Sequence, residues 1–136
     1  MPHYKNQITR NHVQNGGGVH CDAAAAQILD NQIQNNDGEG ICLWGCIAAT
    51  VSGNVISDHR NATHGGIIAT SSYLTTIRNN IIYGNGWNIP IMTIAGGGIL
   101  WWRGSGTISG NLILANGAPS GGGIDASGDT EADCVS

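Results

Sequence analysis

The chain has 136 residues and a net charge of −4, and only 10% of its residues are charged, among them a single lysine, Lys5. This composition lacks the basic stripe of a nucleic-acid-binding protein, and no run of about 18 apolar residues could span a bilayer. The length fits a single domain. The first residues do not have the pattern of a signal peptide, so the default expectation is a cytoplasmic protein, unless the chain is a fragment of a secreted one.

A short sequence pattern occurs five times along the chain. Each copy contains an apolar residue, two polar residues, an asparagine and a further apolar residue, and a glycine-led apolar segment follows it. The copies begin at Ile8, Ile28, Val51, Ile77 and Ile108, their asparagines are Asn11, Asn31, Asn54, Asn80 and Asn111, and the glycine-led segments begin at Gly18, Gly40, Gly66, Gly98 and Gly123. Repetition with this period indicates a solenoid in which each repeat forms one rung.

The spacing of these markers divides each repeat into a constant part and a variable part. From a leading glycine to the next asparagine the steps are 13, 14, 14 and 13 residues, whereas from an asparagine to the next glycine they are 7, 9, 12, 18 and 12. Insertions in solenoids collect on one face, which is often the binding face. We therefore expect any functional site in the variable turns that follow the asparagines.

The glycine-led segments and their neighbours have the composition of β-strands. Apolar and polar residues alternate with a period of two, and Ile and Val are frequent. Stacking the repeats places like residues over like and predicts four core columns. These are Ile8/Ile28/Val51/Ile77/Ile108, Val13/Ile33/Ile56/Ile82/Ile113, Val19/Ile41/Ile67/Ile99/Ile124 and Cys21/Leu43/Ala69/Trp101/Ala126. The same alternation predicts that Trp101 lies in the core and Trp102 outside it.

The asparagines form a fifth column at the corner between two strands. Asparagine tolerates turn geometry, and its amide both donates and accepts, so a ladder of asparagines stabilises stacked parallel strands. Stacked short strands, an asparagine ladder and variable turns resemble the right-handed parallel β-helix of the pectate-lyase-like superfamily, over about residues 8 to 136. The resemblance implies an all-β, single-stranded parallel β-helix of about five rungs, forming one domain over residues 1–136. It implies no particular activity, because such proteins include lyases, hydrolases, epimerases and phage tailspikes.

The ends of this solenoid are expected to be open or poorly capped. Neither end of the sequence shows an amphipathic capping helix, and a bare terminal rung exposes unpaired backbone groups. The chain is therefore either a fragment of a longer β-helix or a protein whose ends pair with another chain.

Two outward columns predict a further contact surface. They comprise His12/Gln32/Val55/Ile81/Leu112 and His20/Cys42/Ile68/Leu100/Asp125, and both are partly apolar. Contiguous exposed apolar area is typical of an interface, although a long turn that folds over these residues is the alternative. We expect a homo-oligomer that forms through the open ends or through an apolar outer wall comprising Val55, Ile68, Ile81, Leu100 and Leu112 with Ile89, Ile91 and Met92 of the longest turn.

The four cysteines give little sign of a metal site. In the absence of an export signal, Cys21, Cys42, Cys46 and Cys134 are expected to be reduced thiols. Cys42 and Cys46 lack a second pair of ligands at zinc-site spacing. The sequence therefore predicts no metal and no cofactor.

The variable turns of neighbouring repeats carry acidic and imidazole side chains. Asp37 and Glu39 lie in the second turn, and Asp58, His59 and His64 lie in the third. Stacking brings these turns to one edge, and glycoside hydrolysis requires two carboxyl groups roughly 5–9.5 Å apart. An imidazole could shuttle the proton. These five residues are therefore the candidate catalytic set. One observation argues against this catalytic set. For an enzyme, the resemblance implies either the acidic Ca²⁺-binding wall of the lyases or the Asp-rich signatures of the polygalacturonase-like hydrolases, and the sequence has neither.

Arg60, Trp87 and Trp102 are the candidate ligand-binding residues. Trp87 stands in the longest turn, on the same edge as Arg60. Trp102 and Trp44 form a candidate platform for sugar rings, with packing inside a turn as the alternative. We expect a non-catalytic β-helix module that binds a carbohydrate or a protein partner. The alternative is a small carbohydrate-active hydrolase or lyase with its site on the variable edge.

Overall fold

A computed structural model describes residues 5–12, 17–60, 65–86 and 96–135, with side chains as far as residue 128. The described residues form twelve strands, connected by turns. These are β1 (Gln7–Thr9), β2 (Val19–Asp22), β3 (Gln27–Leu29), β4 (Gln32–Gln34), β5 (Ile41–Trp44), β6 (Thr50–Ser52), β7 (Val55–Ser57), β8 (Ile67–Arg78), β9 (Ile81–Tyr83), β10 (Ile99–Ser109), β11 (Leu112–Leu114) and β12 (Ile124–Val135). No described segment forms a helix that is long and apolar enough to cross a membrane.

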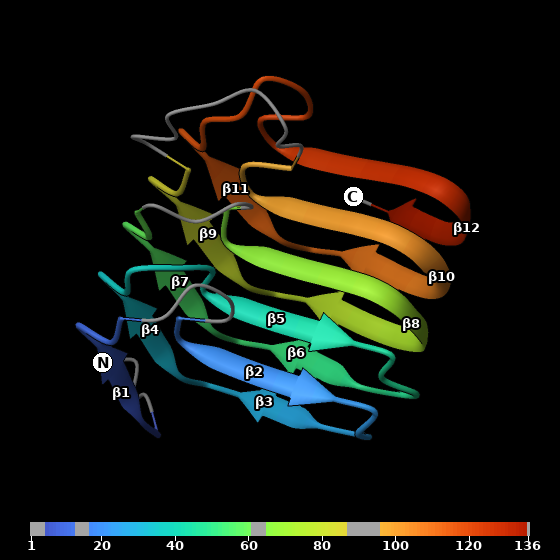
Figure 1. Ribbon diagram of the computed structural model, residues 1–136, viewed down its shortest axis with the longest axis horizontal. Coiled ribbons are helices and arrows are strands. Elements are labelled where there is room, and N and C mark those ends of the chain that lie inside the picture. The colour runs from blue at the N-terminus through green and yellow to red at the C-terminus, as the bar shows by residue number, and fades with distance from the viewer. Residues whose placement is uncertain (1–4, 13–16, 61–64, 87–95, 136) are drawn as a thin grey trace.

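The strands wind into a solenoid with three faces, and every strand pair is parallel (Figure 1). The first face contains β2, β5 and the first parts of β8, β10 and β12. The second face contains β3, β6 and the later parts of the same three long strands, which continue around the corner between the faces. The third face is the sheet β1-β4-β7-β9-β11. The expectation of an all-β parallel helix is therefore confirmed.

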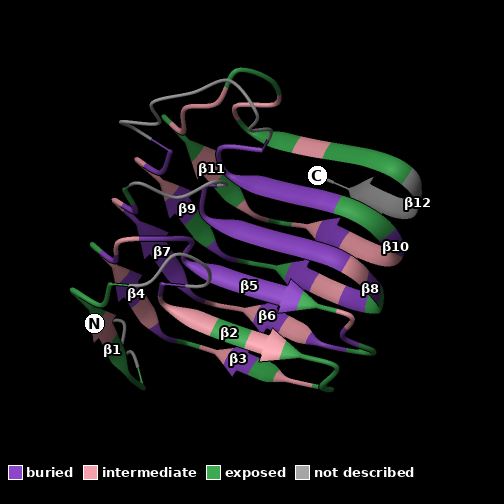
Figure 2. Ribbon diagram, in the orientation of Figure 1, coloured by how far each residue is buried: buried purple, intermediate pink, exposed green. Residues whose placement is uncertain are grey.

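The core is a set of stacked aliphatic columns, most deeply buried in the middle rungs (Figure 2). Ile41, Ile67 and Ile99 are fully buried and lie in register across three strands. Trp101 is also fully buried, whereas Trp102 is exposed, as strand alternation predicts. Among the described residues, the first and last rungs have a neighbour on one side only, so Ile8 and Ile113 are only partly buried. The prediction that Ile124 and Ala126 belong to the core is wrong for the same reason, since both are exposed in the last rung.

The first repeat is aligned differently from the sequence-based expectation. Ile8 pairs with Ile33 and not with Ile28, so its strand belongs to the third face. Asn6, and not Asn11, heads the predicted ladder, and Gln7 takes the place that we assigned to His12 in the outward column. The sequence alignment of this repeat was wrong because each rung contains two stacked polar positions, five residues apart. In the first repeat the motif was matched to the second position, Asn11, and not to the first, Asn6.

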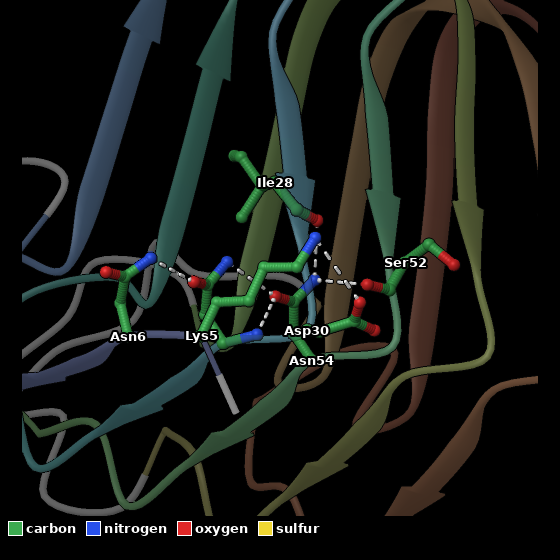
Figure 3. A network of polar contacts seen from close by, with 7 residues as sticks. Lys5, Asn6, Ile28, Asp30, Ser52 and Asn54 are labelled. Atoms are coloured by element: carbon green, nitrogen blue, oxygen red, sulfur yellow. Dashed lines mark hydrogen bonds and ion pairs between the residues drawn. The ribbon is translucent and has the colours of Figure 1, made fainter. Parts of the chain in front are cut away.

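The first ladder comprises Asn6, Asn31, Asn54, Asn80 and Asn111, one from each of five successive rungs (Figure 3 shows its start). Asn54 is typical of its middle positions. Its Nδ2 donates to Asn80 Oδ1 at 3.0 Å and to the Ile28 carbonyl at 2.8 Å, and its Oδ1 accepts from the backbone N–H of Asn31 at 2.9 Å. These bonds satisfy a buried amide and tie each rung to both of its neighbours.

A second ladder comprises Asn11, Asn36, His59, Asn85 and Asn116, each five residues after a member of the first. It explains the leading glycines, which pack against it. A methyl group at Gly40 would lie 2.6 Å from Ile56 Cγ2 and 2.8 Å from His59 Cδ2. Only glycine therefore lets the first face begin so close to this ladder.

The outward columns are less exposed than we expected. Cys42, Ile68 and Leu100 do lie in register, but they form a buried apolar cluster on the outer side of the first face. Val55 is buried as well, whereas Ile81 and Leu112 are exposed. Ile89, Ile91 and Met92 of the proposed outer wall lie outside the described residues, as does Val13 of a predicted core column.

The described cysteines Cys21, Cys42 and Cys46 are free thiols. Desolvation, followed by the nearby carboxylate of Glu39, raises the pKa of Cys42 to about 12. Cys42 is therefore protonated at neutral pH and behaves as a small apolar residue.

Candidate functional site

An open pocket of about 330 Å³ lies at the corner that follows the third face. Two adjacent rungs form it, through the turns after β4 and β7. Its lining comprises Asn35, Asn36, Asp37, Asp58 and Arg60. The structure therefore brings together two of the candidate catalytic residues, Asp37 and Asp58, with the candidate ligand-binding residue Arg60.

Asn35 and Asp58 occupy the same position in successive rungs, immediately after a strand of the third face. Both have left-handed backbone conformations, with φ of 52° and 57°, which Asn and Asp tolerate better than most residues. Asp58 Oδ1 lies 2.9 Å from the point where a Cβ of Gly84 would be, so the carboxylate covers the glycine of the next rung. Asp58 thus helps to shape the corner and also faces the pocket.

His12, Asp37 and Arg60 form a polar column, of which Asp37 and Arg60 line the pocket. Backbone bridges pair Asp37 with His12 on one side and with Arg60 on the other. The side chain of Asp37 accepts a hydrogen bond from Nδ1 of His12 when that nitrogen carries its proton. Asp37 lies between Arg60 and His12. The column can therefore present donors from Arg60 and His12 and an acceptor from Asp37 to a ligand.

His59 lies behind the pocket and acts as a member of the second ladder. Its ring is fully buried, Nε2 is 3.0 Å from the Ile33 carbonyl, and Nδ1 is 3.3 Å from the backbone nitrogen of Asn36. The N–H of Asn36 donates to Nδ1, so Nε2 carries the proton and the ring is neutral. Burial lowers the pKa of His59 to about 4. In this conformation both ring nitrogens are used by the scaffold.

Among the described residues, the candidates Glu39 and Trp102 do not line the pocket. Glu39 is buried, at 2% exposed, and is flanked in the sequence by Gly38 and Gly40. Trp102 lies at the other end of the first face, where the guanidinium of Arg103 is 5.4 Å from its ring centre. His64 and Trp87 lie outside the described residues.

Sequence reasoning missed the amides of Asn35 and Asn36 as pocket residues. The signal was present, since asparagine or histidine follows each asparagine of the first ladder after five residues. With the ladders assigned, each variable turn begins after the second ladder, and the pocket lies at that junction. Within the described part of the chain, no group of three or more His, Cys, Asp or Glu residues could hold a metal ion.

Comparison with known proteins gives a match to one family. The model described as "right handed beta helix region" matches residues 3–134. No curated protein and no solved structure matches the chain.

Proposed function

Because the chain belongs to the right-handed β-helix family, we propose that it is a binding module and that the pocket beside Asp37 and Arg60 takes a carbohydrate without transforming it. The lining of the pocket is the observation that carries this proposal. It combines two carboxylates, one guanidinium and the amide of Asn35 in a site of about 330 Å³, whereas the amide of Asn36 is bonded within the second ladder. Vicinal sugar hydroxyls both donate and accept, and this mixed set of groups can satisfy them.

The scaffold favours binding over catalysis at this site. Both nitrogens of His59 are bonded to backbone atoms, and Glu39 is buried away from the pocket lining. Asp37 is paired with His12. A general acid or base must reach the reacting atom directly or through one water molecule, and a side chain held inside the scaffold does not.

A carbohydrate-active hydrolase is the second candidate, favoured by the presence of Asp37 and Asp58 in one pocket. The two residues come from adjacent rungs, but they are two positions out of register, since Asp37 pairs with Arg60. Glycosidases use two carboxyl groups roughly 5–9.5 Å apart, and both carboxylates line this pocket, so the pair could supply an acid and a base or nucleophile.

Glycan binding and turnover by the same set of variants test both candidates. The binding function predicts that Arg60→Gln and Asp37→Asn each weaken the binding of a glycan found by array screening, with no release of reducing sugar. Arg78→Gln and Asp30→Asn are the matched controls. Arg78 is exposed outside the pocket. Asp30 has a left-handed backbone conformation and covers Gly53, as Asp58 covers Gly84. Turnover that is lost in the double variant Asp37→Asn/Asp58→Asn would favour the hydrolase. Equal effects of the controls would contradict both functions.

We also propose that copies of the chain associate through the third face. The support is the exposure of Ile81, Leu112 and Leu114, which lie on the neighbouring strands β9 and β11. Ile81 and Leu112 are in register, so they form one apolar patch. The buried residues Val55, Ile68 and Leu100 are not available for such a contact in this conformation.

A further inference from the structure

One column of the first face alternates between polar and aromatic residues from rung to rung. It comprises Asp22, Trp44, Thr70, Trp102 and Ser127, which pair in register through β2, β5, β8, β10 and β12. Residues in register on a parallel sheet project from the same side. We call this column the Trp44–Trp102 track.

The two indoles of the track are the most prominent exposed aromatic groups on the first face. Trp44 is 55% exposed and Trp102 is 47% exposed, whereas the neighbouring Trp101 is fully buried on the inner side of the sheet. Two rungs separate Trp44 from Trp102, a distance of about 9.6 Å along the solenoid axis. Neither indole is inserted into the core, so core packing does not account for their presence.

Thr70 lies between the two tryptophans and has an unsatisfied hydroxyl. The residue is 9% exposed, and its Oγ1 has no hydrogen-bond partner among the described residues. A buried hydroxyl without a partner is uncommon and costs free energy. Oγ1 itself is covered in this conformation, so rotation about χ1 must bring it to the surface before a ligand hydroxyl held between the indoles supplies the missing partner.

We propose that the Trp44–Trp102 track binds an extended β-linked oligosaccharide that lies across the strands, parallel to the solenoid axis. Alternate rings of such a ribbon-like chain present the same flat C–H face, at a spacing close to two rungs. Those rings stack on Trp44 and Trp102, and the intervening ring places its hydroxyls over Thr70. Asp22 and Ser127, both exposed, accept and donate hydrogen bonds at the two ends.

Arg103 prepares one of the two indoles for this contact. Its guanidinium lies over Trp102, 5.4 Å from the ring centre, and Gly128 of β12 lies beside the Cδ1–Nε1 edge of the same indole, where a Cβ would be 2.7 Å from Trp102 Cδ1. The indole is therefore held in place before a ligand arrives, which reduces the entropic cost of binding. The track and the pocket share no residue, so this inference stands even if the pocket binds nothing.

Calorimetric titration of the full chain with cellohexaose, chitohexaose and maltohexaose tests the proposal. We expect at least one of the two β-linked hexasaccharides to bind and the helically coiled α-linked maltohexaose to bind at least tenfold more weakly. Trp44→Ala and Trp102→Ala should each weaken binding about tenfold, and Trp→Phe at either position should restore part of the affinity. A trisaccharide is the shortest chain that reaches both indoles, so binding should strengthen sharply from the disaccharide to the trisaccharide.

Two further variants separate this site from its alternatives. Leu74→Ser removes an exposed apolar side chain at the adjoining corner, 69% exposed, and should leave oligosaccharide binding unchanged. Arg78→Gln, at an exposed position on the second face, should also leave it unchanged. The proposal is overturned if neither β-linked hexasaccharide binds, if maltohexaose binds equally well, or if Leu74→Ser weakens binding as much as Trp44→Ala does. The last result would identify a general apolar contact surface.

Discussion

Nε2 of His59 lies 3.0 Å from the carbonyl oxygen of Ile33 and donates a hydrogen bond to it. In the next rung, Nδ2 of Asn85 donates the equivalent bond to the carbonyl oxygen of Ile56 at 3.1 Å. An imidazole therefore replaces an amide in the second ladder. The substitution is accommodated only while the ring is neutral, because Nδ1 must accept from the backbone N–H of Asn36.

The stability of the fold should depend on pH through His59. Its pKa is about 4 in the folded protein, against a usual value of 6.5, so protonation favours the unfolded chain. The contribution of the neutral His59 to the free energy of unfolding is fully present above pH 6.5. It is lost as the pH decreases towards 4, and the total loss is about 3 kcal/mol. Urea unfolding of the wild type and of His59→Asn between pH 7.5 and 4 measures it.

His59→Asn should flatten the pH dependence, because asparagine makes the same ladder bonds without titrating. His20→Asn is the matched control, since it makes the same substitution at an exposed position on the first face. Identical slopes for the wild type and His59→Asn would contradict a neutral buried imidazole.

Removal of a middle amide from the first ladder should cost far more than removal of the terminal one. Asn54→Ala deletes bonds to Ile28 and Asn80 and leaves buried groups unpaired, which should lower the free energy of unfolding by about 2–4 kcal/mol. Asn6→Ala removes one bond from an exposed residue, and its cost should stay below about 1 kcal/mol. Chemical denaturation measures both, and equal losses would show that the ladder does not stabilise the stack.

The leading glycines should not tolerate even a methyl group. In Gly40→Ala the new Cβ would lie 2.6 Å from both Ile56 Cγ2 and the Gly66 carbonyl oxygen, and we expect a loss of about 2–3 kcal/mol. Gly45→Ala is the control, since its Cβ would meet nothing within 4 Å and only the positive φ of 60° would cost about 1 kcal/mol. A melting temperature for Gly40→Ala at or above that of Gly45→Ala would contradict the tight packing.

Self-association should depend on the apolar patch of the third face. Leu112→Ser combined with Ile81→Ser should shift the molar mass measured by light scattering towards the monomer at concentrations where the wild type associates. Tyr73→Ser, at an exposed position on a different corner, serves as the control. A wild type that is monomeric at high concentration, or a double variant with unchanged mass, would contradict the proposed contact.

Much of the scaffold could be predicted from the sequence. The alternation of Ile and Val, the repeated asparagines and the leading glycines predicted parallel strands, the core columns of rungs two to four, and the opposite sides of Trp101 and Trp102. These features are local or periodic, so each repeat gives independent evidence for the same arrangement. The prediction for the first repeat was wrong because Asn6 and Asn11 are each followed two residues later by an apolar residue, Ile8 or Val13. Only the pairing of Ile8 with Ile33 shows which asparagine belongs to the first ladder.

The sequence by itself determined the type of fold and the edge on which Asp37, Asp58 and Arg60 meet, because the period of the strands and the position of the insertions are properties of the chain. Only the tertiary structure decided which residues remain available there. It placed His59 inside a ladder, buried Glu39, and set Thr70 between Trp44 and Trp102. The physical reason is that register between rungs, which depends on turn length and hydrogen bonding, determines what each side chain contacts.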